Sequence, residues 1–268
     1  MASALAVAGI VNSACEMPPP AGGGGGDIGI FENTGRCPVT SRAQGQFTLF
    51  VPTADADCTG PFPVVGWGNG SFTNVGSYTA FLTNVASHGF TVVAANTSNA
   101  NGALGGGGQT VLDDALVLGR GLANVGTQAC TLGYSQGGAA AIRGALLASA
   151  RCAVGIAAEI NATGPANASG LTRVILLGGG ADTTAPVANN SQVLFNQAGA
   201  PKALAVLTGV GHLEPLGNGG RYRGFAIAAL VLNLRSGDPD FAAASRLFNN
   251  DGIRADGRVM SFTRTGTF

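Results

Sequence analysis

The chain has 268 residues, of which 46% are hydrophobic, so it can bury one large apolar core. Its 14 Lys and Arg balance its 14 Asp and Glu, and only 10% of the residues are charged. This composition provides no basic surface for a nucleic acid and no charge that would hold an anionic bilayer. We therefore expect neither a nucleic-acid nor a membrane partner, and a monomer with a single folded domain.

Residues 1–27 are expected to form an irregular N-terminal arm, because residues 18–20 are all proline and residues 22–26 are all glycine. The apolar run at 4–11 is far shorter than the ~20 residues that cross a bilayer. It is compatible with the remnant of a secretory signal, although no Lys or Arg precedes Arg36. The single domain should occupy residues 28–268.

Beyond the arm, short apolar segments rich in β-formers alternate with helix-like segments. The expected strands are 46–51, 63–67, 90–95, 128–133, 152–158, 172–177 and 203–208. The expected helices are 78–87, 110–119, 136–150, 186–198 and 221–235. This alternation predicts an α/β fold with a mostly parallel central sheet and helices on both faces, in which sites form at the carboxyl ends of strands.

Five cysteines favour disulfide bonds and an exported protein. Cys37 and Cys58 can close the first hairpin. Cys130 and Cys152 sit near the starts of two strands that flank one helix, and so near the same edge of a parallel sheet. The alternative is that all five are reduced and act as small apolar fillers. Cys15 is left without an evident partner.

Residues 133–137, Gly-Tyr-Ser-Gln-Gly, match the nucleophile elbow G-x-S-x-G, in which small residues permit a sharp strand-to-helix turn that presents a serine. A chain with 44 glycines can produce this pattern by chance, so its context decides. The apolar strand at 128–133 leads into the motif, and the alanine-rich helix at 136–150 leads out of it. Ser135 is therefore the candidate nucleophile.

A nucleophilic serine needs a base and an orienting acid, which follow it along an α/β chain in the order acid, then histidine. His88 precedes Ser135 and is expected to cap a helix, whereas His212 follows a strand downstream. The only acids between Ser135 and His212 are Glu159 and Asp182. We favour Asp182 because its loop immediately precedes the strand that carries His212. Glu159 remains the alternative acid, and Asp182 can instead cap a helix.

The tetrahedral intermediate of acyl transfer needs backbone N–H donors for its oxyanion. Gln136, which follows the nucleophile, is expected to supply one, and Asn69 in the segment Gly68-Asn69-Gly70 the other. An ordinary Asn-Gly turn is the alternative for Asn69. The chain shows no metal-ligand spacing, and its glycine run at 105–108 lacks the ending of a phosphate loop. We expect an acyl-enzyme mechanism without a cofactor or metal.

Five segments taken together resemble the bacterial polyesterases, which include cutinases, poly(ethylene terephthalate) hydrolases and dienelactone-hydrolase-like esterases. They are residues 65–70, 87–90, 133–138, 181–186 and 209–212, and the similarity of order and spacing covers roughly residues 45–240. The resemblance implies the α/β-hydrolase fold without a lid domain and a secreted carboxylic-ester hydrolase. It also implies a triad of Ser135, Asp182 and His212, with oxyanion amides at Asn69 and Gln136.

Substrate contacts are expected at Trp67, Gly68, Tyr134 and Ile160, although a tryptophan that closes an apolar strand can equally lie in the core. The aromatic residues that polyester-cleaving members place around the site correspond here to Asn69 and Ile160, which is a departure from the family pattern. The expected substrate is an ester, polymeric or small and soluble. A non-catalytic binding protein of the same fold and a structural cell-surface protein are the rival interpretations.

Overall fold

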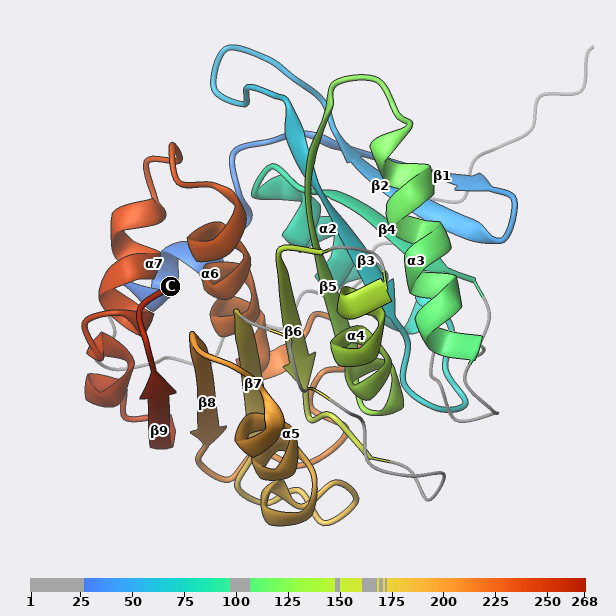
Figure 1. Cartoon of the computed structure of the whole chain (residues 1–268). Coiled ribbons are helices and arrows are strands. Elements are labelled where there is room, and N and C mark those ends of the chain that lie inside the picture. The colour runs from blue at the N-terminus through green and yellow to red at the C-terminus, as the bar shows by residue number, and fades with distance from the viewer. Residues whose placement is uncertain (1–26, 97–106, 148–149, 161–167, 169–170, 172) are drawn as a thin grey trace, which may run out of the picture.

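A nine-stranded sheet with the strand order β1-β2-β4-β3-β5-β6-β7-β8-β9 forms the centre of the molecule (Figure 1). This computed structural model describes residues 27–96, 107–147, 150–160, 168, 171 and 173–268. The pairs β4–β3, β3–β5, β5–β6, β6–β7 and β7–β8 are parallel. The pairs β1–β2, β2–β4 and β8–β9 are antiparallel. The predicted α/β class with a mostly parallel sheet is confirmed, while the predicted arm, apart from Asp27, lies outside the described residues.

The strands are β1 (Val39–Gln44), β2 (Phe47–Pro52), β3 (Phe62–Gly68), β4 (Thr91–Ala95), β5 (Val125–Tyr134), β6 (Cys152–Ile156), β7 (Val174–Gly179), β8 (Lys202–Leu207) and β9 (Val259–Thr265). Every residue of β3, β4, β6 and β7 is buried, as expected for parallel strands covered on both faces. The edge strands β1 and β9 were not predicted. Their side chains are mostly exposed, so they carry no apolar run for a sequence pattern to detect.

The helices are α1 (Ile28–Glu32), α2 (Thr79–Ser87), α3 (Gly107–Arg120), α4 (Gln136–Leu147), α5 (Ser191–Gln197), α6 (Arg223–Leu234) and α7 (Phe241–Phe248). Helices α3, α4 and α5 cover one face of the sheet, and α2 and α6 cover the other, where α1 and α7 pack against α6 (Figure 1). The short helices α1 and α7 were also missed by the sequence analysis. No helix in the described residues is long and apolar enough to cross a membrane.

The helix predicted at 186–198 is broken in two, which is a correction with a consequence for the site. A short 3₁₀ turn, Val187–Asn189, precedes α5, and Asn190 between them leaves the helical conformation. The Asn190 side chain donates to the Pro186 carbonyl (3.0 Å) and accepts from the Ile160 N–H (2.8 Å). The break therefore gives the segment after β6 a fixed hydrogen-bond partner.

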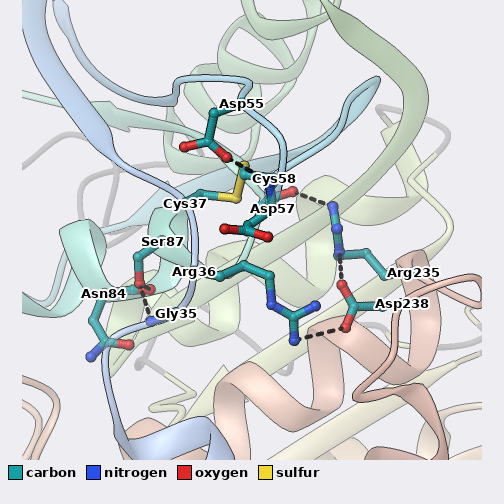
Figure 2. The surroundings of a disulfide bond; sticks show 11 residues. Gly35, Arg36, Cys37, Asp55, Asp57, Cys58, Asn84, Ser87, Arg235 and Asp238 are labelled. Carbon is teal, nitrogen blue, oxygen red and sulfur yellow. Dashed lines mark hydrogen bonds and ion pairs between the residues drawn. A yellow bond between two sulfur atoms is a disulfide. The ribbon is translucent and has the colours of Figure 1, made fainter.

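Both expected disulfides are present. Cys130 and Cys152 are register partners on the neighbouring parallel strands β5 and β6, with Cα atoms 4.7 Å apart. Cys37 and Cys58 bracket the β1–β2 hairpin, with Cα atoms 5.1 Å apart (Figure 2). Cys15 lies outside the described residues.

The Cys37–Cys58 disulfide lies beside residues 35 and 36, which contact helix α2 and the loop after α6. We call these two residues the strap. The Gly35 N–H donates to the Ser87 hydroxyl (2.8 Å), and Figure 2 shows Arg36 beside Asp238, which in turn binds Arg235 (2.9 Å). Cys58 shortly precedes β3 and Ser87 shortly precedes β4, so these contacts lie at the end of the sheet opposite the carboxyl ends of the parallel strands. The strap is therefore a structural feature remote from the region where the site was predicted.

Candidate active site

Ser135 occupies the sharp turn between β5, which ends at Tyr134, and α4, which begins at Gln136. Its φ of 57° lies in the left-handed region, which a non-glycine residue adopts only where the surroundings enforce it. The main chain packs closely around this turn, at the glycines on either side of the serine. A Cβ on Gly133 would come within 2.1 Å of the Gly137 oxygen, and one on Gly137 within 2.2 Å of the Gly68 oxygen. The strand-turn-helix geometry thus requires small residues on both sides of Ser135.

His212 reaches this serine from the loop after β8. The Ser135 Oγ lies 2.9 Å from His212 Nε2, at hydrogen-bond distance, and the serine is only 3% exposed. The loop that carries His212 crosses to the far side of the site, where Gly217 accepts from the Phe81 N–H (3.2 Å) and donates to the Ser77 carbonyl (2.9 Å). These contacts fix the imidazole beside the serine although 77 residues separate the two in the chain.

Asp182 binds the other ring nitrogen of His212. Its Oδ2 lies 2.8 Å from His212 Nδ1, while its Oδ1 accepts the backbone N–H groups of Thr184 (2.9 Å) and Ala185 (2.7 Å). The carboxylate side chain has no exposed surface. Both of its oxygens are therefore held, and the imidazole proton is directed to Nδ1, which leaves Nε2 free to accept a proton from the serine.

The competing acid, Glu159, faces the nucleophile rather than the base. Its Oε2 lies 3.2 Å from Ser135 Oγ, and its backbone N–H donates to the Ser135 carbonyl (2.9 Å). The structure therefore brings both acids to the site but gives them different neighbours: Asp182 contacts His212, and Glu159 contacts Ser135.

The chain matches no protein-family profile and no curated protein sequence. The functional interpretation therefore depends on the geometry of the site.

The segments expected to supply the oxyanion donors pack against each other. Gln136 is the first residue of α4, and the backbone N–H groups of a first helical turn have no partner within the helix. The Asn69 carbonyl lies close against Gly137, since a Cβ there would approach it to 2.3 Å. The Asn69 side chain points into the fold, where it accepts from Trp67 Nε1 (2.8 Å) and donates to the Ala95 carbonyl (2.8 Å). The side chain of Asn69 is therefore engaged within the fold by these two bonds.

The residues expected to contact substrate differ in how far they are buried. Trp67 is fully buried, edge-on to Tyr78 (5.0 Å between ring centroids) and Phe81 (5.6 Å), which is the core position given as the alternative to a substrate contact. Gly68 is buried against the elbow as well. Ile160 is half-buried beside Glu159 and is the one member of the set with exposed side-chain surface next to the site.

Tyr134 acts on the histidine loop. It is almost fully buried, its hydroxyl donates to the His212 carbonyl (2.9 Å), and its ring centroid lies 5.2 Å from that of the imidazole. Burial is the main cause that raises the pKa of Tyr134, and the negative charges of Asp182 and Glu159 add to it. The phenol therefore remains a neutral donor that clamps the His212 loop.

Exposed apolar side chains occur on two loops that follow strands at the carboxyl edge of the sheet, and they were not predicted. Phe72, on the loop after β3, is fully exposed, and Leu213 and Leu216, on the loop of His212, are 69% and 37% exposed. We refer to these three exposed side chains, which lie on the loops that follow β3 and β8, as the apolar rim. The sequence signal was available, since Phe72 lies three residues after Asn69 and Leu213 directly follows His212.

His88, the second histidine, plays no part in this site. It caps the C-terminus of α2, as predicted, is 8% exposed, and contacts the Asn33 carbonyl through Nε2 (3.1 Å). Burial is the largest influence on its pKa and lowers it. Within the described ranges, no group of three His, Cys, Asp or Glu side chains is placed to hold a metal ion.

Proposed function

We propose that this protein is a serine carboxylic-ester hydrolase of the α/β-hydrolase fold. The hydrogen-bonded chain from Ser135 Oγ through both ring nitrogens of His212 to Asp182 carries the proposal, because it contains a nucleophile, a base and an orienting acid in contact. The topology supports it: the serine follows β5, the acid follows β7 and the histidine follows β8 of a mostly parallel sheet.

The proposed reaction proceeds in two half-reactions. His212 accepts the hydroxyl proton of Ser135 while Oγ attacks the ester carbonyl carbon, and the backbone N–H groups of Gln136 and Asn69 bind the oxyanion. The intermediate collapses when the alkoxide leaves with the proton from His212, which gives acyl-Ser135. A water molecule then transfers a proton to His212 and attacks the acyl carbon, and the carboxylic acid leaves as the proton returns to Oγ.

The surroundings of the triad favour uncharged, apolar esters. The apolar rim of Phe72, Leu213 and Leu216 offers surface to an acyl chain or to a polyester, and Ile160 extends that surface on the β6 side. The connection from Ile156 to Val174 is too short for a separate lid domain, so we propose an open site. Two disulfides fit an oxidising compartment, and we propose that the enzyme is exported.

Hydrolysis of p-nitrophenyl butyrate tests the proposal. Ser135→Ala and His212→Ala should lower kcat/KM by about three or more orders of magnitude, because each removes a group that the reaction requires. Ser41→Ala is the matched control, since Ser41 is exposed on the edge strand β1, and it should retain wild-type activity. Undiminished turnover in Ser135→Ala would contradict the proposed nucleophile.

A further inference from the structure

Glu159 places a carboxylate beside the nucleophile that the proposed reaction does not use. The Ser135 hydroxyl has two acceptors, Glu159 Oε2 at 3.2 Å and His212 Nε2 at 2.9 Å, and its single proton can point to only one of them at a time. When the hydroxyl turns to His212 for reaction, Glu159 remains next to the oxygen to which the acyl group becomes attached.

Three hydrogen bonds hold the segment that carries this carboxylate against the nucleophile elbow. The Ser135 N–H donates to the Ile156 carbonyl (2.9 Å), and the Glu159 N–H donates back to the Ser135 carbonyl (2.9 Å). The next residue, Ile160, donates its N–H to the Asn190 side chain (2.8 Å). The segment after β6 is therefore anchored to the nucleophile elbow, and the position of Glu159 follows that of Ser135.

The charge of Glu159 has no cationic partner among the described residues, since none of their Lys or Arg side chains forms an ion pair with it. Arg221, the base on the histidine loop, is bound to Glu214 (2.9 Å). Asp182 adds a second carboxylate, which the imidazolium balances during reaction. The negative charge of Glu159 reaches its surroundings, because it contributes to the raised pKa of the neighbouring Tyr134.

We propose that Glu159 sets the charge selectivity of the site, so that esters with an anionic group two or three carbons from the scissile carbonyl are disfavoured relative to neutral and cationic ones. This inference rests on the proposed ester hydrolysis. Because Oγ becomes part of the acyl-enzyme ester, a charge at that position lies within about 8 Å of Glu159, inside the Debye length. Coulomb interaction across a partly hydrated site of this size predicts an effect of about tenfold in kcat/KM.

Three p-nitrophenyl esters with the same leaving group test the proposal: the neutral butyrate, the anionic hemiglutarate and the cationic 4-(trimethylammonio)butyrate. In Glu159→Gln, the anionic-to-neutral ratio of kcat/KM should rise about tenfold, and the cationic-to-neutral ratio should fall. Asp57→Asn is the matched control, because Asp57 is exposed on the loop between β2 and β3, at the opposite end of the sheet. This variant should keep the wild-type ratios although it loses the same charge.

A salt titration of the wild type gives a second measurement that needs no variant. Added salt should raise the anionic-to-neutral ratio toward that of Glu159→Gln, because it screens the carboxylate. Equal ratios in wild type and Glu159→Gln would overturn the inference, as would a ratio independent of salt, which decides the matter if the variant does not fold. Ser135-dependent butyrate hydrolysis would then still support the proposed function. Absence of butyrate hydrolysis in the wild type would instead overturn both.

Discussion

Replacing Asp182 with Asn should nearly abolish activity although the change is almost isosteric. The Asp182 Oδ1 accepts two backbone N–H groups, at 2.9 and 2.7 Å, so the carbonyl oxygen of an asparagine must occupy that position. The asparagine NH₂ group then faces His212 Nδ1. In the wild type, Asp182 Oδ2 accepts a hydrogen bond from that nitrogen at 2.8 Å. Two donors cannot face each other, so the imidazole proton moves to Nε2. The nitrogen that should accept the Ser135 proton is thereby blocked.

The cost of this wrong tautomer is about 1,000- to 10,000-fold in kcat, or about 4 to 5.5 kcal/mol of transition-state stabilisation. Steady-state hydrolysis of p-nitrophenyl butyrate measures it, and a thermal melt by circular dichroism shows that the variant is folded. Asp114→Asn, on the exposed face of α3, is the matched control and should retain full activity. Retention of more than a tenth of wild-type kcat/KM in Asp182→Asn would refute the tautomer argument. If Glu159→Gln were inactive at the same time, Glu159 would be the acid.

Three further predictions concern stability and packing. Burial, as the main cause, lowers the pKa of His88, so the unfolded chain takes up a proton near pH 6.5 that the folded protein resists. The free energy of unfolding should therefore fall as the pH drops from 7 to 5, and it should fall less in His88→Gln. Chemical denaturation of both proteins at each pH measures this. An equal decline in both proteins would contradict this. Removal of the Cys37–Cys58 bridge by a double Ser replacement should lower the free energy of unfolding by about 3 kcal/mol in a urea titration, because the bridge joins residues 21 apart. The value of kcat/KM should stay unchanged, because the bridge lies at the end of the sheet opposite the site. A large loss of activity would contradict this separation of the bridge from the site. Gly137→Ala should lower activity, and should lower stability by about 2 kcal/mol, because the added Cβ meets a backbone oxygen at 2.2 Å. Gly257→Ala is the control and should be near neutral, because its Cβ meets nothing within 4 Å. A fully active Gly137→Ala would contradict the close packing of the oxyanion segments.

The sequence was sufficient to place the candidate nucleophile, the candidate base and two candidate acids at one edge of the sheet, because chain order and the alternation of elements together constrain them. An apolar strand followed by G-x-S-x-G predicts an elbow, and in a parallel sheet everything that follows a strand meets at one edge. That rule brought Ser135, Asp182, His212 and Glu159 to the same place. It could not decide which acid faces the imidazole, because that depends on the paths of two loops.

Other features had no local signal. The hydroxyl of Tyr134 binds the carbonyl of His212, 78 residues away, and only the folded path of the histidine loop creates this contact. The contacts of Trp67 are a second example: its indole packs edge-on against Tyr78 and Phe81, which the sequence pattern assigns only to a helix. The edge strands β1 and β9 escaped prediction because one or both of their faces are exposed, which removes the apolar pattern that identifies buried strands.

Covalent labelling tests the central claim most directly. A p-nitrophenyl alkylphosphonate should react with the wild type to give one adduct per chain, located by mass spectrometry on the peptide that contains Ser135, and the loss of hydrolytic activity should parallel its formation. Ser135→Ala should form no such adduct. Failure of the wild type to react, or an adduct on another residue, would contradict the account of Ser135 as an activated nucleophile.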